Sequence, residues 1–380
     1  MEKNLRRAAG NLLVVGLGGS ELTGLERAWL RLVRPAGVVL FKRNITDPEQ
    51  TRALVDEATG LGALHSARFV DVEGGTVNRF RDALASMPSA QAVARADARL
   101  GKKGGTLARE HGVLIGRAVK AFGFNTTLAP VVDLALPVSA EVLGSRAPAE
   151  SPAHVIAFTR EFLAGLASEG VVGCGKHFPG LGSAAGDTHF VTPEIRRTFR
   201  EMWDEDLVPY RELHKQMPMI MTNHAAYPQT KSGDVPASAT RFWIETVLRK
   251  QIGYRGLILT DDLEMGGILK FMPIEEAAVT AVRVGSDLLE ICHSVELILR
   301  TFEALIAEGE KSVSFRRLLL QRATEVERKR ARLFRGVPKA PTAKQFESLR
   351  ERVNRFRDRV TSLSESDTVT PRATAPAEHV

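Results

Sequence analysis

The sequence predicts an α/β protein, a (β/α)8 barrel of the TIM type over about residues 10–335, and three observations support this fold class. Short apolar runs recur along the chain, and a stretch with helical periodicity follows each of them. The runs are mostly apolar on both faces, as buried parallel strands are. Charged and polar residues repeatedly stand where the runs end, which matches the end of a barrel that carries active sites.

Eight runs are expected to form the strands of the barrel. They are Leu12–Leu17, Ala36–Lys42, Ala67–Asp71, Thr127–Asp133, Val171–His177, Met219–His224, Leu257–Asp262 and Asp287–Cys292. Amphipathic stretches between the runs are expected to be helices, namely Asp47–Leu61, Leu107–Phe122, Pro152–Glu169, Thr198–Gln216, Ala239–Ile252 and Ile274–Val284. A doubly wound sheet is the alternative. The first run disfavours it, because Gly16-Leu17-Gly18-Gly19 lacks the third glycine of a dinucleotide fingerprint.

The C-terminal part differs in composition from the barrel. Gly336, Pro338 and Pro341 favour a domain end, so we divide the chain into a barrel domain at 1–335 and an extension at 336–380. The extension is expected to hold one charged helix over 344–360 and a disordered tail. Residues 311–360 carry 16 Lys and Arg against 5 Asp and Glu, whereas the whole chain has a net charge of +7. Because the basicity belongs to the C-terminal helix and the extension and the rest of the chain is nearly neutral, no nucleic-acid partner is expected.

The two cysteines indicate a reducing compartment. Cys174 and Cys292 both lie in apolar runs, so we expect two buried thiols and no disulfide. No segment approaches the ~20 apolar residues of a membrane span, and the N-terminal apolar run is too short for a secretory signal. The sequence therefore predicts a cytoplasmic protein without a membrane span. We expect a monomer or weak oligomer.

One loop concentrates groups that can do chemistry. Its residues are Lys176-His177-Phe178-Pro179-Gly180-Leu181-Gly182-Ser183-Ala184-Ala185-Gly186-Asp187-Thr188-His189. A glycine-rich loop after a strand, holding a lysine, two histidines and a carboxylate, is a poor core element and typical of a site, because functional groups concentrate on loops that a rigid scaffold presents.

Other polar residues end other predicted strands and are expected to meet this loop at one rim. They are Lys42-Arg43-Asn44, Asp71 with Glu73, Asp133, His224 and the pair Asp261-Asp262. Carboxylates beside Arg and Lys suit a polyhydroxylated ligand. His177, His189 and His224 lack the spacing of a zinc site, so neither a metal nor a cofactor is expected.

These residues resemble glycoside hydrolase family 3, in particular its single-domain bacterial β-N-acetylglucosaminidases of peptidoglycan recycling. The resemblance covers about residues 10–335. It rests on His224 and on five motifs, which are Phe41-Lys42-Arg43-Asn44-Ile45, Asp71-Val72-Glu73-Gly74-Gly75, Leu128-Ala129-Pro130-Val131-Val132-Asp133, Lys176-His177-Phe178-Pro179-Gly180 with Asp187-Thr188-His189, and Thr260-Asp261-Asp262-Leu263-Glu264-Met265.

The resemblance implies a retaining exo-β-N-acetylglucosaminidase that hydrolyses terminal β-linked N-acetylglucosamine from peptidoglycan or chitin-type fragments. Asp261 is implied as the nucleophile of a covalent glycosyl-enzyme. His189 is implied as general acid and then base, with Asp187 orienting it. The substrate-binding residues implied are Asp71, Arg79, Arg146, Lys176, His177 and Met265.

The chain departs from the family pattern at Leu181, where His is common, at Thr76, where Arg is usual, and over residues 147–152. A family 3 β-glucosidase or a phosphorylase is the alternative within enzymes. The phosphorylase is considered because an Asp-His pair in place of a Glu repels an anionic acceptor such as phosphate less. A catalytically silent sugar-binding protein is the hypothesis from another class, and the intact catalytic residues argue against it.

Overall fold

The computed structural model describes residues 2–101, 105–184, 192–334 and 336–364. Within these residues, eight parallel strands form a closed barrel in the order β1-β12-β11-β8-β7-β6-β3-β2. They are β1 (Leu13–Gly16), β2 (Gly37–Leu40), β3 (Ala67–Val70), β6 (Thr126–Thr127), β7 (Val172–Phe178), β8 (Met219–Thr222), β11 (Leu257–Asp262) and β12 (Leu288–Ile291). Because β1 pairs with both β2 and β12, the sheet has no free edge. The predicted (β/α)8 fold is confirmed.

The fourth barrel strand is shorter than predicted. The run Thr127–Asp133 forms regular ladder pairs only in β6, because Pro130 has no amide N–H to donate. Beyond β6 the chain stays beside β7 through separate hydrogen bonds. The amide of Lys176 donates to the carbonyl of Pro130 at 3.1 Å, and the amide of Val132 donates to the carbonyl of Lys176 at 2.6 Å. Asp133 is thereby held at the C-terminal end of the barrel.

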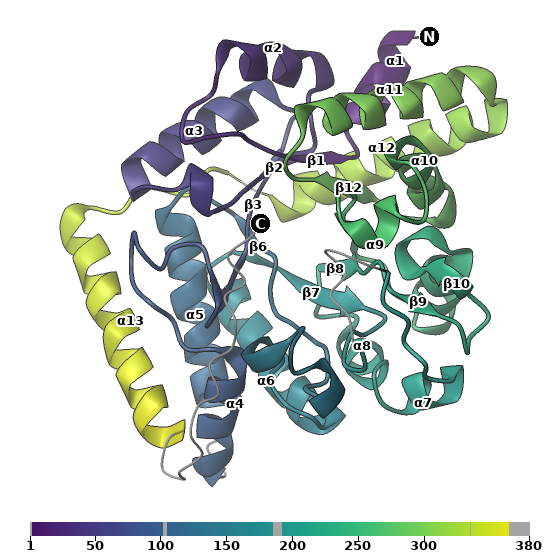
Figure 1. Cartoon of the computed structure of the whole chain (residues 1–380). Helices are drawn as coiled ribbons and strands as arrows, with labels where there is room; N and C mark the ends of the chain where they lie inside the picture. Colours follow the sequence, from purple (N-terminus) through teal and green to yellow (C-terminus); the bar gives the residue numbers. More distant parts are fainter. Residues whose placement is uncertain (1, 102–104, 185–191, 335, 365–380) are drawn as a thin grey trace.

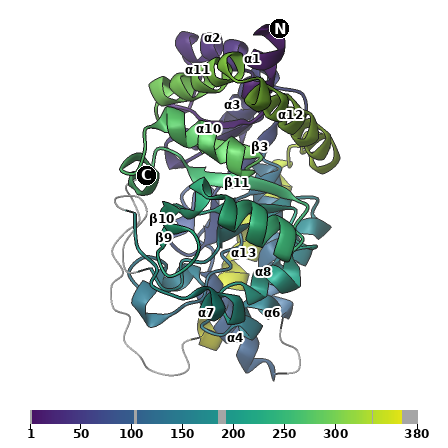
Figure 2. The same cartoon turned by 90° about the vertical axis from the view of Figure 1, so that its right-hand side faces the viewer.

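Helices surround the barrel (Figure 1). They are α1 (Glu2–Gly10), α2 (Gly24–Val33), α3 (Pro48–Leu61), α4 (Ala90–Arg99), α5 (Thr106–Ala121), α6 (Pro152–Ser168), α7 (Phe199–Asp204), α8 (Val208–Leu213), α9 (Gly266–Leu269), α10 (Ile274–Val284), α11 (Val295–Lys311), α12 (Val313–Leu333) and α13 (Ala343–Ser364). Figure 2 shows α1, α11 and α12 together at one side of the barrel, where they contact one another. None of the described helices combines the length and apolar character needed to cross a membrane.

Two predicted helices differ from expectation. The stretch Thr198–Gln216 is divided into α7 and α8, because Pro209 lies in the first turn of a new helix, the position that tolerates a missing N–H. The stretch Ala239–Ile252 contains a π-helical segment, Phe242–Gln251.

A short hairpin extends the barrel beyond β3. It consists of β4 (Val72–Gly74) and β5 (Val77–Asn78), with Gly74 and Gly75 at φ 96° and 61° in its turn. A Cβ at Gly74 would lie 2.2 Å from the carbonyl oxygen of Pro88, so only glycine fits there. This turn returns the chain to the rim, with Glu73 before it and Arg79 after it.

Helix α13 lies along α4 and α5 (Figure 1). Its apolar face buries Leu349, Val353, Phe356 and Val360, and the ring of Phe356 stacks on His111 at 5.8 Å. The predicted charged helix is therefore present and packed on the outer layer of the barrel. The proposed boundary at 335/336 stays a prediction.

Candidate active site

The C-terminal ends of several barrel strands carry the site residues that the sequence predicted. Asp71 follows β3 directly, Lys176 and His177 lie in β7, and Asp261 lies in β11. Because the barrel strands are parallel, the C-terminal ends of β3, β7 and β11 lie at the same end of the barrel. Lys176 Nζ contacts Asp71 Oδ1 there at 2.8 Å.

A buried network of charges forms the centre of the site. Lys176 Nζ lies 2.8 Å from Asp71 Oδ1 and 2.6 Å from Glu73 Oε1. Arg146, in a short helical turn over Gly144–Arg146, donates two hydrogen bonds to the Glu73 carboxylate, at 2.9 and 2.8 Å. Although burial opposes the charge, Arg146 and Lys176 hold the pKa of Glu73 well below its ordinary value. Glu73 thus fixes both cations as charged donors.

The surroundings of Lys176 also favour its charged form. Its side chain is 3% exposed, and burial alone would favour the neutral amine. Asp71 and Glu73 outweigh that effect and raise the pKa of Lys176. Arg79 Nη2 lies 3.6 Å from the other oxygen of Asp71, and its guanidinium lies over the ring of Phe41. Asp71 is therefore a carboxylate between two cations.

His177 is oriented by Asp133, which is buried. The ring Nδ1 lies 2.7 Å from Asp133 Oδ2, and the backbone amide of Leu181 donates to Asp133 Oδ1 at 2.8 Å. The other ring nitrogen, Nε2, lies 3.4 Å from Arg146 Nη2. Asp133 thus sets the ring orientation of His177 and also attaches the start of the glycine-rich loop.

The two adjacent carboxylates of β11 have different environments. Asp261 is partly buried, and its Oδ1 accepts a hydrogen bond from the amide of Asp262 at 3.0 Å. Asp262 is buried, and its Oδ1 accepts from the amide of Glu264 at 3.0 Å. Burial, reinforced by the nearby Glu264, raises the pKa of Asp262 to about 8. Asp262 therefore anchors the turn after β11.

Met265 and His224 support this turn. Met265 is buried and precedes α9. His224 is also buried, with Nδ1 2.7 Å from Ser238 Oγ and Nε2 3.0 Å from the carbonyl oxygen of Asp262. Although the sequence grouped His224 with the polar rim residues, both of its ring nitrogens are engaged in these contacts.

The predicted residues Asp187 and His189 lie outside the described residues. The chain on either side of them is attached to the same rim. Leu181 is bound to Asp133, as above. Thr192 Oγ1 donates to the carbonyl of Gly267 in α9 at 2.6 Å, and the amide of Ile195 donates to the carbonyl of Ala226 at 2.8 Å.

Sequence reasoning did not assign roles to Glu73 and Asp133, although it noted both among the polar residues. Each is a buried carboxyl group that holds a predicted substrate-binding residue in place. The positions of these two residues could have indicated their roles. Glu73 lies two residues after Asp71 on the same edge of a hairpin, and Asp133 ends a predicted strand.

A closed barrel of alternating strands and helices, with paired buried charges at the C-terminal ends of its strands, defines an enzyme of the TIM-barrel class. The family model of the glycosyl hydrolase family 3 N terminal domain matches residues 5–326, and the chain belongs to this family. The protein is thus a glycoside hydrolase.

Curated relatives and solved structures agree with this assignment. The chain is 36% identical to a β-hexosaminidase from Alkalilimnicola ehrlichii over 75% of this chain and 82% of the relative. It is 35% identical to a β-hexosaminidase from Methylococcus capsulatus over 80% and 89%. A family 3 β-N-acetylglucosaminidase from Paenibacillus has a TM-score of 0.83 at 27% identity, covering 93% of this chain and 68% of that chain. NagZ from Neisseria gonorrhoeae, in complex with N-trifluoroacetyl-D-glucosamine, has a TM-score of 0.76 at 26% identity, covering 93% and 98%.

Proposed function

We propose that the protein is an exo-acting, retaining β-N-acetylglucosaminidase that releases terminal N-acetylglucosamine from muropeptide or chitin-type fragments. The observation that carries this proposal is the network of Asp71, Glu73, Arg146 and Lys176 at the same rim as Asp261. The names of the relatives support the N-acetylglucosamine preference, since they are β-hexosaminidases and the NagZ structure holds an N-acylated glucosamine.

The network suits a sugar because a hydroxyl group both donates and accepts a hydrogen bond. A hydroxyl lying beside the Asp71–Lys176 pair can donate to the carboxylate and accept from the ammonium. Arg79 and Arg146 supply further donors in fixed planes. Since the charges are already paired before substrate arrives, the donors need no reorganisation when the sugar binds.

In the proposed reaction, Asp261 attacks the anomeric carbon while the bond to the leaving oxygen breaks. His189 gives its proton to that oxygen, so the aglycone departs as a neutral alcohol. His189 then takes a proton from water, and the oxygen of that water displaces Asp261 from the sugar. Asp187 orients the imidazole in both steps. The two displacements together retain the β configuration.

The hydrogen bond from the Asp262 amide to Asp261 Oδ1 supports the nucleophile assignment. It restrains the rotation of the Asp261 carboxylate relative to β11. The side chain of Asp262 is itself bound to the Glu264 amide in the following turn, so its role in the proposal is structural.

A panel of aryl β-glycosides tests the proposal. We expect the N-acetylglucosaminide to be turned over with a much higher kcat/KM than the glucoside or the xyloside. Proton NMR of the first product should show β-N-acetylglucosamine. Faster cleavage of the glucoside would indicate a β-glucosidase, formation of a sugar 1-phosphate in phosphate buffer would indicate a phosphorylase, and no turnover of any glycoside would indicate a silent binding protein.

We also propose that the enzyme works in the cytoplasm. Cys174 and Cys292 are both buried and unpaired, as the sequence predicted, which suits a reducing compartment.

A further inference from the structure

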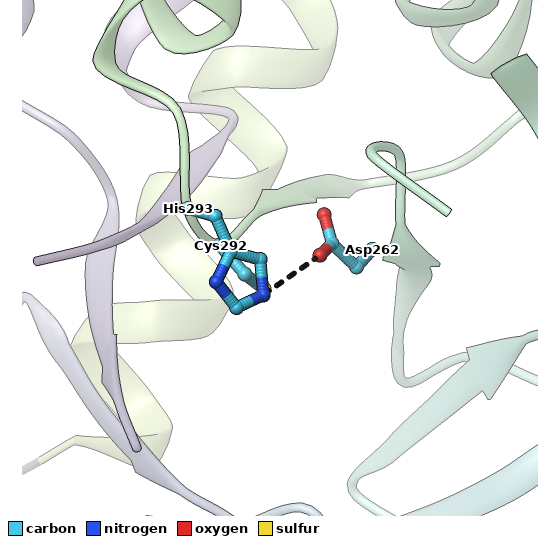
Figure 3. A group of neighbouring side chains, drawn as sticks. All are labelled: Asp262, Cys292 and His293. Carbon is cyan, nitrogen blue, oxygen red and sulfur yellow. Dashed lines mark ion pairs between the residues drawn. The ribbon is translucent and has the colours of Figure 1, made fainter. Parts of the chain in front are cut away.

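Three side chains beside the site have the chemistry of a metal centre. They are Asp262 at the end of β11 and Cys292 and His293 directly after β12, the neighbouring strand. Figure 3 shows the imidazole of His293 directed toward the Asp262 carboxylate, with Cys292 beside it. Nε2 of His293 lies 3.7 Å from Asp262 Oδ2, and the three possible ligand atoms all lie within 4.8 Å of one another.

A thiolate, an imidazole and a carboxylate together favour Zn²⁺ over harder cations. Zinc takes sulfur, nitrogen and oxygen ligands in tetrahedral sites, whereas Mg²⁺ and Ca²⁺ select oxygen. Zinc–ligand bonds of ~2.0–2.3 Å place neighbouring ligand atoms roughly 3–4 Å apart. The spacing of the three atoms therefore needs only small side-chain rotations to close around a cation.

The backbone that carries these ligands is already fixed. The Glu264 carboxylate accepts hydrogen bonds from the amides of Cys292, His293 and Ser294, at 3.0, 2.5 and 2.7 Å. Arg43 donates to the carbonyl oxygen of Cys292 at 2.7 Å. The turn after β12 is thus bound to the turn after β11, so the ligands from the two strands keep their spacing.

A buried carboxyl group next to the cluster gives an independent indication. Glu290, on β12, is 2% exposed, and its Oε1 lies 3.5 Å from Cys292 Sγ. Its Oε2 is buried without a hydrogen-bond partner among the described residues. An unpaired buried oxygen is costly. A cation held by Cys292 would give this carboxyl group a nearby positive charge.

We propose that Asp262, Cys292 and His293 bind Zn²⁺. On binding, the Cys292 thiol and the Asp262 carboxyl group release their protons to water, and zinc forms bonds to Cys292 Sγ, Asp262 Oδ2 and the His293 imidazole with no change of oxidation state. The sequence analysis expected no metal because it compared histidine spacings, whereas these ligands come from two strands and include the cysteine. The site has one consequence for the reaction, and this consequence rests on the proposed function. A cation next to Asp261 stabilises its carboxylate and makes it a weaker nucleophile, so zinc inhibits turnover.

Cobalt absorption measures binding without reference to activity. Added to the metal-free protein, Co²⁺ should produce a thiolate-to-metal charge-transfer band with one equivalent bound, and Zn²⁺ should displace it. Cys292→Ser should abolish the band. Cys174→Ser, which changes the other buried thiol, is the matched control and should retain it. His293→Asn should weaken Zn²⁺ affinity at least tenfold in competition with a chromophoric chelator. Circular dichroism checks that each variant is folded.

Activity assays separate this site from the proposed catalytic residues. Zn²⁺ should inhibit the unchanged enzyme, and His293→Asn should keep the metal-free rate while resisting inhibition at least tenfold. Absence of the band in the unchanged protein, or its persistence in Cys292→Ser, would overturn the site. The site would also be overturned if His189→Ala lost Zn²⁺ affinity while both Cys292→Ser and His293→Asn kept it. If the band forms as expected and zinc leaves turnover unchanged, the binding site stands and its inhibitory consequence is wrong.

Discussion

Replacing Glu73 with Gln removes the anion that holds Arg146 and Lys176 together. Gln has the shape of Glu and lacks its charge, and its amide N–H would face a cation. Lys176 keeps Asp71 at 2.8 Å, whereas Arg146 keeps, among the described residues, a contact of 3.4 Å to His177 and the longer-range attraction of Asp71 and Asp133. Most of the cost therefore falls on Arg146.

The magnitude follows from burial. Removing one partner of a buried ion pair costs about 3–5 kcal/mol. Since Lys176 retains a carboxylate, we expect the lower end, about 3 kcal/mol, in the free energy of unfolding. Misplacing a positioning group by ~1 Å costs about 100-fold in rate. We therefore expect kcat/KM for an aryl N-acetylglucosaminide to fall about 100-fold, which corresponds to ~2.7 kcal/mol.

Urea denaturation and steady-state kinetics measure the two effects. Glu57→Gln is the matched control, because Glu57 accepts two hydrogen bonds from Arg27 in a pair that is exposed. Water screens exposed pairs, so the control should change little. If Glu73→Gln unfolds with the same free energy as Glu57→Gln and keeps kcat/KM, the buried network does not position the site.

Three further perturbations test other parts of the molecule. Asp287 is buried among Arg249, Arg322 and Lys329, and although burial opposes it these cations hold its pKa below the ordinary 3.8. Its stabilising effect is therefore complete above that pH and lost as the pH falls further, so Asp287→Asn should lower the free energy of unfolding by about 3–5 kcal/mol at neutral pH. In urea titrations the difference from the unchanged protein should shrink with acidification, and a constant difference would contradict this. Truncation after Ala340 removes α13 and should lower the melting temperature by at least about 5 °C. The loss of the helix exposes to water the surfaces of α4 and α5 that its apolar face covers. An unchanged melting temperature would mean that α13 is dispensable. His189→Ala should slow cleavage of a natural disaccharide by ~10²–10⁴-fold and slow glycosylation by a dinitrophenyl glycoside far less, with azide restoring turnover as a glycosyl azide. Equal loss for all leaving groups without azide rescue would assign His189 a structural role.

The sequence allowed the barrel to be predicted because the signal was repeated. All eight predicted strands overlap the observed ones, and their apolar character comes from burial on both faces. Local exceptions depended on single residues. Pro130 shortens the regular part of the fourth barrel strand, and Pro209 starts a second helix where the periodicity suggested one.

The candidate site was predictable only as far as strand ends could be placed. The sequence located Asp71, Lys176 and Asp261 on one rim, and the resemblance to family 3 implied their roles. It did not reveal that Glu73 joins Arg146 to Lys176, because residues 73, 146 and 176 meet through tertiary packing. The sequence analysis did not identify the cluster of Asp262, Cys292 and His293 for the same reason, because the pairing register of two strands brings its members together.

Trapping the covalent intermediate tests the proposed mechanism most directly. A 5-fluoro-N-acetylglucosaminyl fluoride should inactivate the enzyme with the mass of one fluorosugar, and peptide mapping should place that sugar on Asp261. Asp261→Asn should be folded, inactive and unlabelled. An adduct on another carboxylate, or active Asp261→Asn enzyme, would contradict the assignment of Asp261 as the nucleophile.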